Sequence, residues 1–220
     1  ETKDPNLNVS GPGWATGDGY VTGFAIATDT WSGYLPIRHE GGGNLDEGLV
    51  KRWVNKTLSS DCDKIFHNAL YDVGWLKREG IQINGKIHDT VIAAPLVDEN
   101  KRRYSLNILG EEYCGDIKDE TLLTEAANSY GVDAKSEMWR LPARYVGHYA
   151  EQDALLTLKL WDKLSKLMDI ENLHSIYELE SSLIPLLVEM RWNGVRVDEN
   201  KAEQSAKELK IKENECVKQI

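Results

Sequence analysis

The sequence has few cysteines, no long apolar stretch and no signal-peptide pattern. Its three cysteines, Cys62, Cys114 and Cys216, lie far apart without metal-binding spacing, so a disulfide framework is not expected. No apolar run approaches the roughly 20 residues that span a bilayer, and the first residues lack the basic and apolar regions of a secretory signal. These absences indicate a protein without membrane segments that works in a reducing compartment.

Positive charge is also scarce. The 26 Lys and Arg residues are outnumbered by 36 Asp and Glu, which gives a formal net charge of −10. A chain of this charge does not hold nucleic acid by bulk electrostatic attraction. It is compatible with an enzyme that meets phosphates through bound cations, because clustered carboxylates make a protein acidic before a metal binds.

The order of the expected elements indicates a mixed α/β fold. Two segments rich in β-branched and aromatic residues, 19–30 and 31–37, are typical of a hairpin. Asn44 is expected to cap a helix over 45–58, and 64–66 is expected to be a short buried strand. Strand and helix then alternate before helices take over, which is the pattern of an α/β domain.

A change of pattern near residue 171 predicts a second unit. It begins with a helix that contains Pro185 and continues through a turn, a short strand and a final helix. We therefore expect one domain over 1–170 and the beginning of a larger domain over 171–220.

Two carboxylates are expected inside apolar helices. Asp72 lies in the stretch "HNALYDVGWL", and Asp153 lies in a long helix expected over 148–168. An unpaired buried carboxylate costs several kcal/mol, so each needs a partner or a metal. Asn68 and Asp72 are four residues apart, as are Tyr149 and Asp153, so each pair shares one helix face.

A third acidic residue, Glu1, opens the polar run "ETKDPNL". Carboxylates from separate elements are the ligands that Mg²⁺ prefers, and two such ions about 4 Å apart can activate water and stabilise the leaving oxygen of a phosphodiester. A tyrosine hydroxyl beside them can orient the water. Each residue alone is better explained by a structural role, but the combination favours a metal site.

Other polar residues receive structural interpretations. Asp89 is expected to cap the helix over 90–97, and the basic run Lys101–Arg103 to be a solvated loop, with a DNA-backbone contact as the lesser alternative. The five histidines show no metal-binding spacing.

The motifs N-x-x-x-D in "NALYD" and Y-x-x-x-D in "YAEQD" resemble the second and third motifs of the DnaQ-like 3′–5′ exonucleases. The first motif of that family is D-x-E, and the initial "ET" matches its second half, so its Asp is expected two positions before Glu1. The segments 86–115 and 178–203 resemble the helices between the last two motifs and the passage into the thumb of family A DNA polymerases of phage or bacterial type.

This resemblance implies an RNase H-like, DnaQ-like fold with a mixed central sheet flanked by helices. Most of the first strand is expected to be missing, and the start of a helical thumb region follows. The implied function is that of a two-metal-ion 3′–5′ exonuclease that releases nucleoside monophosphates from DNA as the proofreading part of the polymerase. Because the first-motif Asp is absent, this sequence by itself is expected to be inactive.

The resemblance also implies roles for individual residues. Glu1 and Asp153 would ligate the tighter of two Mg²⁺ ions, for which Mn²⁺ can substitute, and Asp72 would act through water on the second. Tyr149 and Glu1 would position the attacking water. The residues expected on the substrate side are Thr2, near the terminal nucleotide, and Asn68, which supports the second motif.

The implied partners are a single-stranded or frayed 3′ end of DNA and the remainder of the polymerase chain. A monomer in the cytoplasm of a bacterial or phage-infected cell is expected. Two alternatives remain open. An RNase D-like ribonuclease shares the motifs and the fold, although it has no reason to carry the segment 183–198, and an inactive exonuclease-fold scaffold would keep the fold without the activity.

Overall fold

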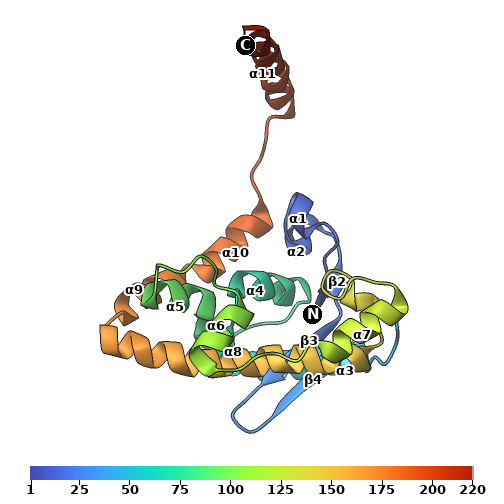
Figure 1. The fold of residues 1–220 in the computed structure, drawn as a ribbon, viewed down its shortest axis with the longest axis vertical. Helices are drawn as coiled ribbons and strands as arrows, with labels where there is room; N and C mark the ends of the chain where they lie inside the picture. Colours follow the sequence, from blue (N-terminus) through green and yellow to red (C-terminus); the bar gives the residue numbers. More distant parts are fainter. Residues whose placement is uncertain (220) are drawn as a thin grey trace.

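A computed structural model describes residues 1–219 as a mixed α/β domain with a small strand region surrounded by helices (Figure 1). The strands are β1 (Thr2–Lys3), β2 (Tyr20–Val21), β3 (Gly23–Ala27), β4 (Ser32–Pro36), β5 (Lys64–Phe66) and β6 (Ile87–Asp89). The helices are α1 (Leu7–Ser10), α2 (Gly13–Thr16), α3 (Glu47–Leu58), α4 (Ala69–Arg78), α5 (Thr90–Val97), α6 (Leu106–Cys114), α7 (Thr121–Tyr130), the 3-10 turn η1 (Met138–Arg140), α8 (Ala143–Glu171), α9 (His174–Ser182), α10 (Ile184–Asn193) and α11 (Glu199–Gln219). Ile220, the last residue of the expected second unit, lies outside the described residues.

The strands pair as β1 with β2, β3 with β4 and β5 with β6, of which only the last pair is parallel. The backbone of Glu1 joins the first two pairs. Its nitrogen donates to the carbonyl of Gly23 at 2.8 Å, and its carbonyl accepts from the amide of Thr22 at 2.9 Å. The strand expected over 19–30 is therefore β2 and β3 with an interruption at Thr22, and Glu1 lies against its middle.

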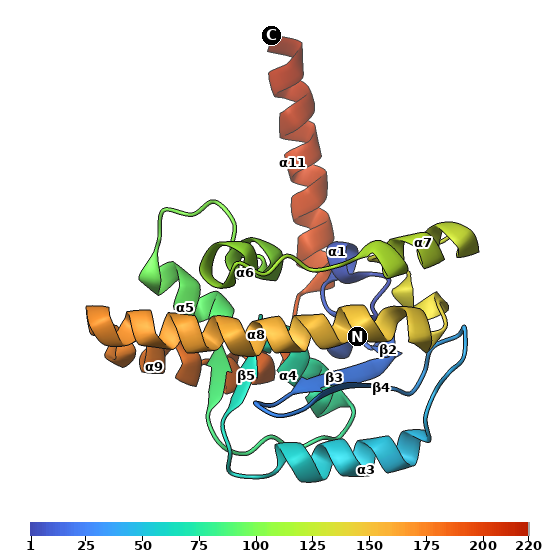
Figure 2. The same ribbon diagram turned by 60° about the horizontal axis from the view of Figure 1, so that its bottom comes forward.

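Helix α8 is the central element of the helical layer. It packs against β3 and β4 on one side and against α5, α6 and α7 on the other, and Figure 2 shows it running across the whole molecule. The helix expected over 148–168 extends beyond both ends, because Ala143, Val146 and Met168 continue its buried stripe. It ends at Asn172, which adopts the left-handed conformation typical of a helix end.

Three groups of buried apolar side chains form the core. The first lies between the early strands, α3, α4 and α10, the second between α5, α6, α8 and α9, and the third around α7 and η1 on α8. Tyr177 of α9 and Ile184 and Val188 of α10 are buried in these groups. Helix α11 is exposed and stands apart from the rest in both views (Figures 1 and 2). The boundary between 1–170 and 171–220 stays a prediction.

Three local predictions were wrong. Asp46 rather than Asn44 caps α3, accepting from the amide of Leu49 at 2.6 Å, because Asn44 bonds the backbone of His39 instead. Pro185 lies in the first turn of α10, where its missing N–H costs no helical hydrogen bond. Among the described residues no strand follows α10, and an extended segment leads to α11 instead.

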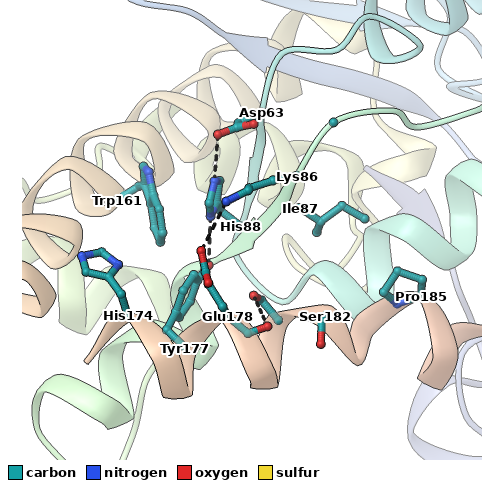
Figure 3. Close-up of a pocket in the computed structure, with 12 residues that line it drawn as sticks. Asp63, Lys86, Ile87, His88, Trp161, His174, Tyr177, Glu178, Ser182 and Pro185 are labelled. Carbon is teal, nitrogen blue, oxygen red and sulfur yellow. Dashed lines mark hydrogen bonds and ion pairs between the residues drawn. The ribbon is translucent and has the colours of Figure 1, made fainter. Parts of the chain in front are cut away.

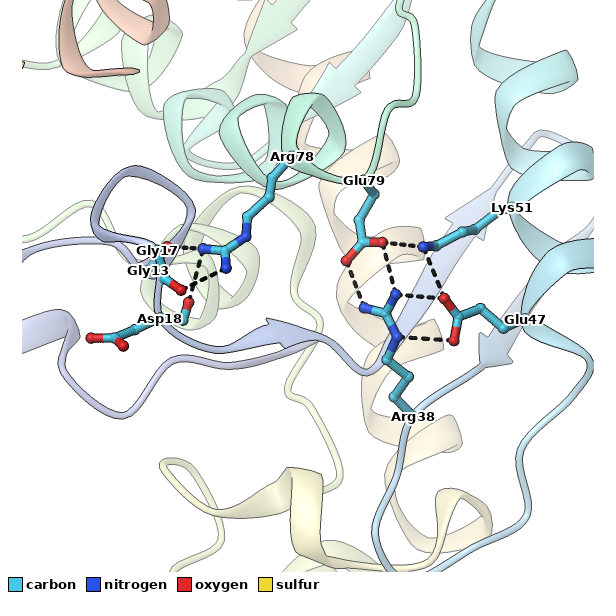
Figure 4. A network of polar contacts seen from close by, with 8 residues as sticks. All are labelled: Gly13, Gly17, Asp18, Arg38, Glu47, Lys51, Arg78 and Glu79. Atoms are coloured by element: carbon cyan, nitrogen blue, oxygen red, sulfur yellow. Dashed lines mark hydrogen bonds and ion pairs between the residues drawn. The ribbon is translucent and has the colours of Figure 1, made fainter. Parts of the chain in front are cut away.

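A charge network ties the loop after β4 to α3 and α4 (Figure 4). The Glu79 side chain is only 7% exposed and binds Arg38 at 2.7 Å and Lys51 at 2.5 Å. Arg38 also donates from Nε to Glu47 at 3.0 Å. Burial raises the pKa of Glu79, but the hydrogen bonds from Arg38 and Lys51 outweigh it and hold that pKa below its usual value. The Arg38 and Lys51 bonds lower the pKa of Glu47 to about 2.

Helix α4 is anchored from two further directions. Arg78 donates to the carbonyls of Gly17 at 2.7 Å and Asp18 at 3.1 Å, and so binds the loop after α2 (Figure 4). Gly74 leaves room for the indole of Trp14, since a Cβ at Gly74 would lie only 2.1 Å from that ring. No helix in the described part of the chain combines the length and apolar character that crossing a membrane requires.

We predict that Glu79→Ala lowers the free energy of unfolding by about 3 kcal/mol, because it removes the buried carboxylate that binds both Arg38 and Lys51. Glu47→Ala is the matched control. Its carboxylate is 42% exposed, so its loss costs about 1 kcal/mol or less. Urea denaturation at pH 7 measures both, and equal losses in the two variants would contradict the prediction.

We also predict that this network makes the protein sensitive to acid. Carboxyl groups with a depressed folded-state pKa stabilise the fold above their unfolded pKa, near 4.5, and lose that contribution as the pH falls toward 2. Denaturation midpoints at pH 7 and pH 3 test this in the parent and in Arg38→Met. The variant should lose less stability between the two pH values, because Lys51 alone then lowers the pKa values of its carboxyl groups and lowers them less.

Candidate active site

The helix that carries the second motif is positioned by a carboxylate from another strand. Asp89 at the end of β6 accepts the amides of Asn68 at 2.9 Å and Ala69 at 2.7 Å, which are the first N–H groups of α4. It also caps α5 as predicted, accepting from Val91 at 2.8 Å. Asn68 has φ +73°, a left-handed conformation that asparagine tolerates, and its side chain does not cap the helix.

Asp72 lies in the first turn of α4 and is half-buried. Within residues 1–219, no other residue donates a hydrogen bond to its carboxylate. Burial raises the pKa of Asp72 to about 7; the N-terminal ammonium opposes the rise, and the negative charges of Asp89 and Glu1 add to it. The sequence predicts that Asp72 has either a partner or a metal, and its role in a metal site stays a prediction.

The third motif lies on α8, where Tyr149 and Asp153 occupy one face as their spacing predicts. The Asp153 carboxylate pairs with the ammonium of Lys118, which also lies 3.5 Å from the Tyr149 hydroxyl. Burial raises the pKa of Asp153, and Lys118 opposes the rise. Burial likewise raises the pKa of Tyr149, and Asp153 and Glu1 raise it further, so the phenol stays protonated near neutral pH.

Glu1 connects the two motifs. Its backbone bonds β3, against which α8 packs, and its negative charge raises the pKa of Asp72 on α4 and of Tyr149 and Asp153 on α8. The Glu1 carboxylate accepts no hydrogen bond from any residue of the described chain. The hydroxyl of the next residue, Thr2, lies 2.8 Å from the Tyr71 hydroxyl on α4.

The side chains are of the types that bind a divalent cation, but they are not arranged as a complete set of ligands. Half-buried carboxylates that accept no hydrogen bond from another described residue, such as Glu1 and Asp72, are suited to hard metal ions. However, nowhere in the described residues do three His, Cys, Asp or Glu side chains stand in a ready-made ligand cluster. The charge of Asp153 is already balanced by Lys118.

Sequence reasoning missed Lys118. It lies in "GDIKDE", a polar connector between α6 and α7 in which no spacing distinguishes it from an ordinary surface lysine. The basic residues that were considered, Lys101–Arg103, lie elsewhere, and Lys101 pairs with Asp98 and Glu112. A second missed lysine, Lys135, lies 4.3 Å from the centre of the Tyr149 ring.

A separate groove of about 460 Å³ lies between β6, α8 and α9 (Figure 3). Its wall is the ring of His88, stacked 4.3 Å from Trp161 and 6.0 Å from Tyr177, with Asp63 bound to the imidazole at 3.1 Å. None of the motif carboxylates lines this groove. The aromatic stacking and the ion pair give these residues a structural role.

Comparison with known proteins supports an exonuclease domain. Residues 19–169 match the family model of the 3′–5′ exonuclease domain of family A DNA polymerases. A DNA-directed DNA polymerase of Pseudomonas phage M6 is 38% identical over the whole chain, and DNA polymerase DpoZ of Vibrio phage phiVC8 is 32% identical over 84% of it. DNA polymerase I of Synechocystis is 27% identical over 75% of the chain. The chain spans 34%, 31% and 16% of these three proteins.

We predict that Asp72→Asn stabilises the metal-free protein by about 1 kcal/mol, because it removes a half-buried carboxylate that accepts no hydrogen bond from another described residue and is repelled by Asp89 and Glu1. Asp89→Asn should do the opposite and cost about 1–3 kcal/mol, because the amide cannot accept from three backbone N–H groups at once. Urea denaturation in the presence of a chelator compares the two variants. Destabilisation by Asp72→Asn would show that its carboxylate has a structural partner after all.

Proposed function

Because this chain belongs to the family of 3′–5′ exonuclease domains of family A DNA polymerases, we propose that its carboxylates hold two divalent ions for phosphodiester hydrolysis. The reaction releases nucleoside monophosphates from the 3′ end of DNA. Magnesium is the proposed ion, with manganese as a substitute. The observation that carries the proposal is the place of Glu1: its backbone bonds Gly23 of β3, against which α8 packs, and the next residue, Thr2, contacts Tyr71 beside Asp72 on α4.

The proposed roles follow from where the side chains lie. Glu1 and Asp153 would hold the tighter ion and Asp72 would hold the second through water. When bound, such ions lower the pKa of a coordinated water and stabilise the leaving oxygen. Tyr149 keeps its proton because its pKa is raised by burial and by the neighbouring carboxylates, so its hydroxyl can donate to or orient the attacking water.

On the substrate side the proposed residues are Thr2 and Asn68. Thr2 lies directly after Glu1, so the terminal nucleotide would reach it once its phosphate is at the carboxylates. Asn68 contributes through its left-handed backbone, which lets its own amide and that of Ala69 reach Asp89. These two assignments rest on position in the fold.

We propose that the chain works as the proofreading part of a larger DNA polymerase. Relatives that are DNA polymerases, of which the chain spans a third or less, support this context. The partners would be a single-stranded or frayed DNA 3′ end and the rest of the polymerase. A monomer in the cytoplasm of a bacterial or phage-infected cell is part of the same proposal. The polymerase relatives favour DNA over the RNA substrate of an RNase D-like enzyme.

The deciding experiment uses a polymerase that contains this chain preceded by the D-x-E strand. We predict that it releases mononucleotides from labelled single-stranded DNA with Mg²⁺ and that Asp153→Asn lowers the rate by about 100-fold or more, since even groups behind metal ligands cost 10–100-fold. Asp162→Asn is the control, because Asp162 lies on the same helix and pairs only with exposed Lys166.

Three outcomes are informative. Loss of release in Asp153→Asn alone supports the proposed nuclease. A folded polymerase that releases nothing supports the inactive scaffold. Faster degradation of RNA than of DNA of the same sequence supports the ribonuclease alternative. Repeating the assay with the 220-residue chain alone tests whether the upstream Asp is required.

A further inference from the structure

The connector between α6 and α7 lies along the motif helix α8 and contacts it at successive points. Asp116 binds Lys159 at 2.6 Å, and the amide of Asp119 donates to Gln152 at 3.2 Å. Lys118 lies between these two contacts and reaches Asp153. The connector therefore runs antiparallel to α8, and its two flanking contacts direct the Lys118 side chain toward the carboxylate.

The Lys118 ammonium is enclosed in the site. Its side chain is only 6% exposed, and its nitrogen lies on Asp153 and 4.6 Å from the centre of the Tyr149 ring. A buried ammonium is costly unless it is paired, so Asp153 and the face of the tyrosine ring supply the compensation. The nearby carboxylate of Glu120 is engaged by Lys135 at 2.6 Å.

We propose that Lys118 is a resident cation that competes with the divalent ion for Asp153. This inference rests on the proposed function, in which Asp153 is a metal ligand. Lys118 holds Asp153 and Tyr149 in position while no metal is bound, and its ammonium must leave the carboxylate before a metal ion can take its place. It is a positioning residue and not a catalytic one.

The competition has a measurable size. When a ligand binds only one state of a protein, its apparent dissociation constant is the intrinsic constant divided by the fraction of protein in that state. If Lys118 occupies Asp153 for about nine-tenths of the time, the apparent affinity for a divalent ion is about tenfold weaker than in a protein without the ammonium. The same ammonium lowers the cost of burying Asp153 in the metal-free protein. Its removal is therefore expected to raise the affinity for the divalent ion and to lower the stability of the metal-free fold.

The test is Mn²⁺ binding to this chain preceded by the D-x-E strand, measured by titration calorimetry and by paramagnetic broadening. Lys118→Met keeps the length and the buried stem but removes the charge, and Lys118→Gln removes the charge while keeping a polar end. Lys118→Arg keeps the charge. Lys159→Met is the matched control, because it removes a neighbouring lysine of α8 that binds the same connector. Denaturation in a chelator verifies that each variant is folded.

We predict that Lys118→Met and Lys118→Gln bind Mn²⁺ about tenfold more tightly and unfold more easily in a chelator. Lys118→Arg and Lys159→Met should bind like the parent. Unchanged or weaker Mn²⁺ binding in both neutral variants would overturn the inference, as would equal tightening by Lys159→Met, which would assign the effect to a loosened connector. No Mn²⁺ binding in any protein would overturn the metal site and this inference together, whereas binding that is equal in all of them removes only the role of Lys118.

Discussion

The carboxylate of Asp89 is the interaction on which the rest of the site depends. It accepts the first amides of α4 and an amide of α5, so one buried negative charge satisfies the N-terminal ends of two helices. The parallel register of β5 and β6 sets Phe66 beside Asp89, which brings Asn68 within reach of it. The hydroxyl of Tyr177 accepts from the Asp89 amide at 2.9 Å, so α9 is fixed at the same point. Strand pairing, two helix starts and a later helix are thereby tied to a single side chain.

Asp89 and Asp72 show how differently one fold treats two carboxylates. Asp89 is 4% exposed and is offset by three backbone N–H groups, whereas Asp72 is half-buried and has no such donors among residues 1–219. Burial raises the pKa of both groups; three backbone N–H groups oppose the rise at Asp89, and the pKa of Asp72 is raised to about 7. A charge that a fold leaves uncompensated costs stability, and such costs concentrate at functional sites. The contrast therefore singles out Asp72, and not the more deeply buried Asp89, as the group with a chemical role.

The spacing of residues within one helix was readable from the sequence, while contacts between elements were not. Positions four apart placed Tyr149 with Asp153, because helix geometry decides which side chains share a face, whereas Asn68 lies outside α4 with a left-handed backbone, so the same spacing does not place it with Asp72. The cap of α5 was local as well, since Asp89 directly precedes that helix. The second cap that Asp89 provides to α4 spans about 20 residues of chain, and Lys118 reaches Asp153 across 35 residues. Neither contact leaves a periodic pattern in the sequence, because the partners are brought together only by tertiary folding.

Local charge matters more than net charge for an acidic protein that is proposed to bind DNA. A net charge of −10 repels a polyanion at long range, but at physiological salt such repulsion is screened beyond about 8 Å. Inside that distance the field at the site depends on a few groups. Lys118 and Lys135 lie on the Tyr149 ring, at 4.6 and 4.3 Å from its centre, and offset part of the charge of the surrounding carboxylates. Cations bound by Glu1, Asp72 and Asp153 would offset the remainder, so the attraction for a phosphate would be confined to the point where the bond is to be cleaved.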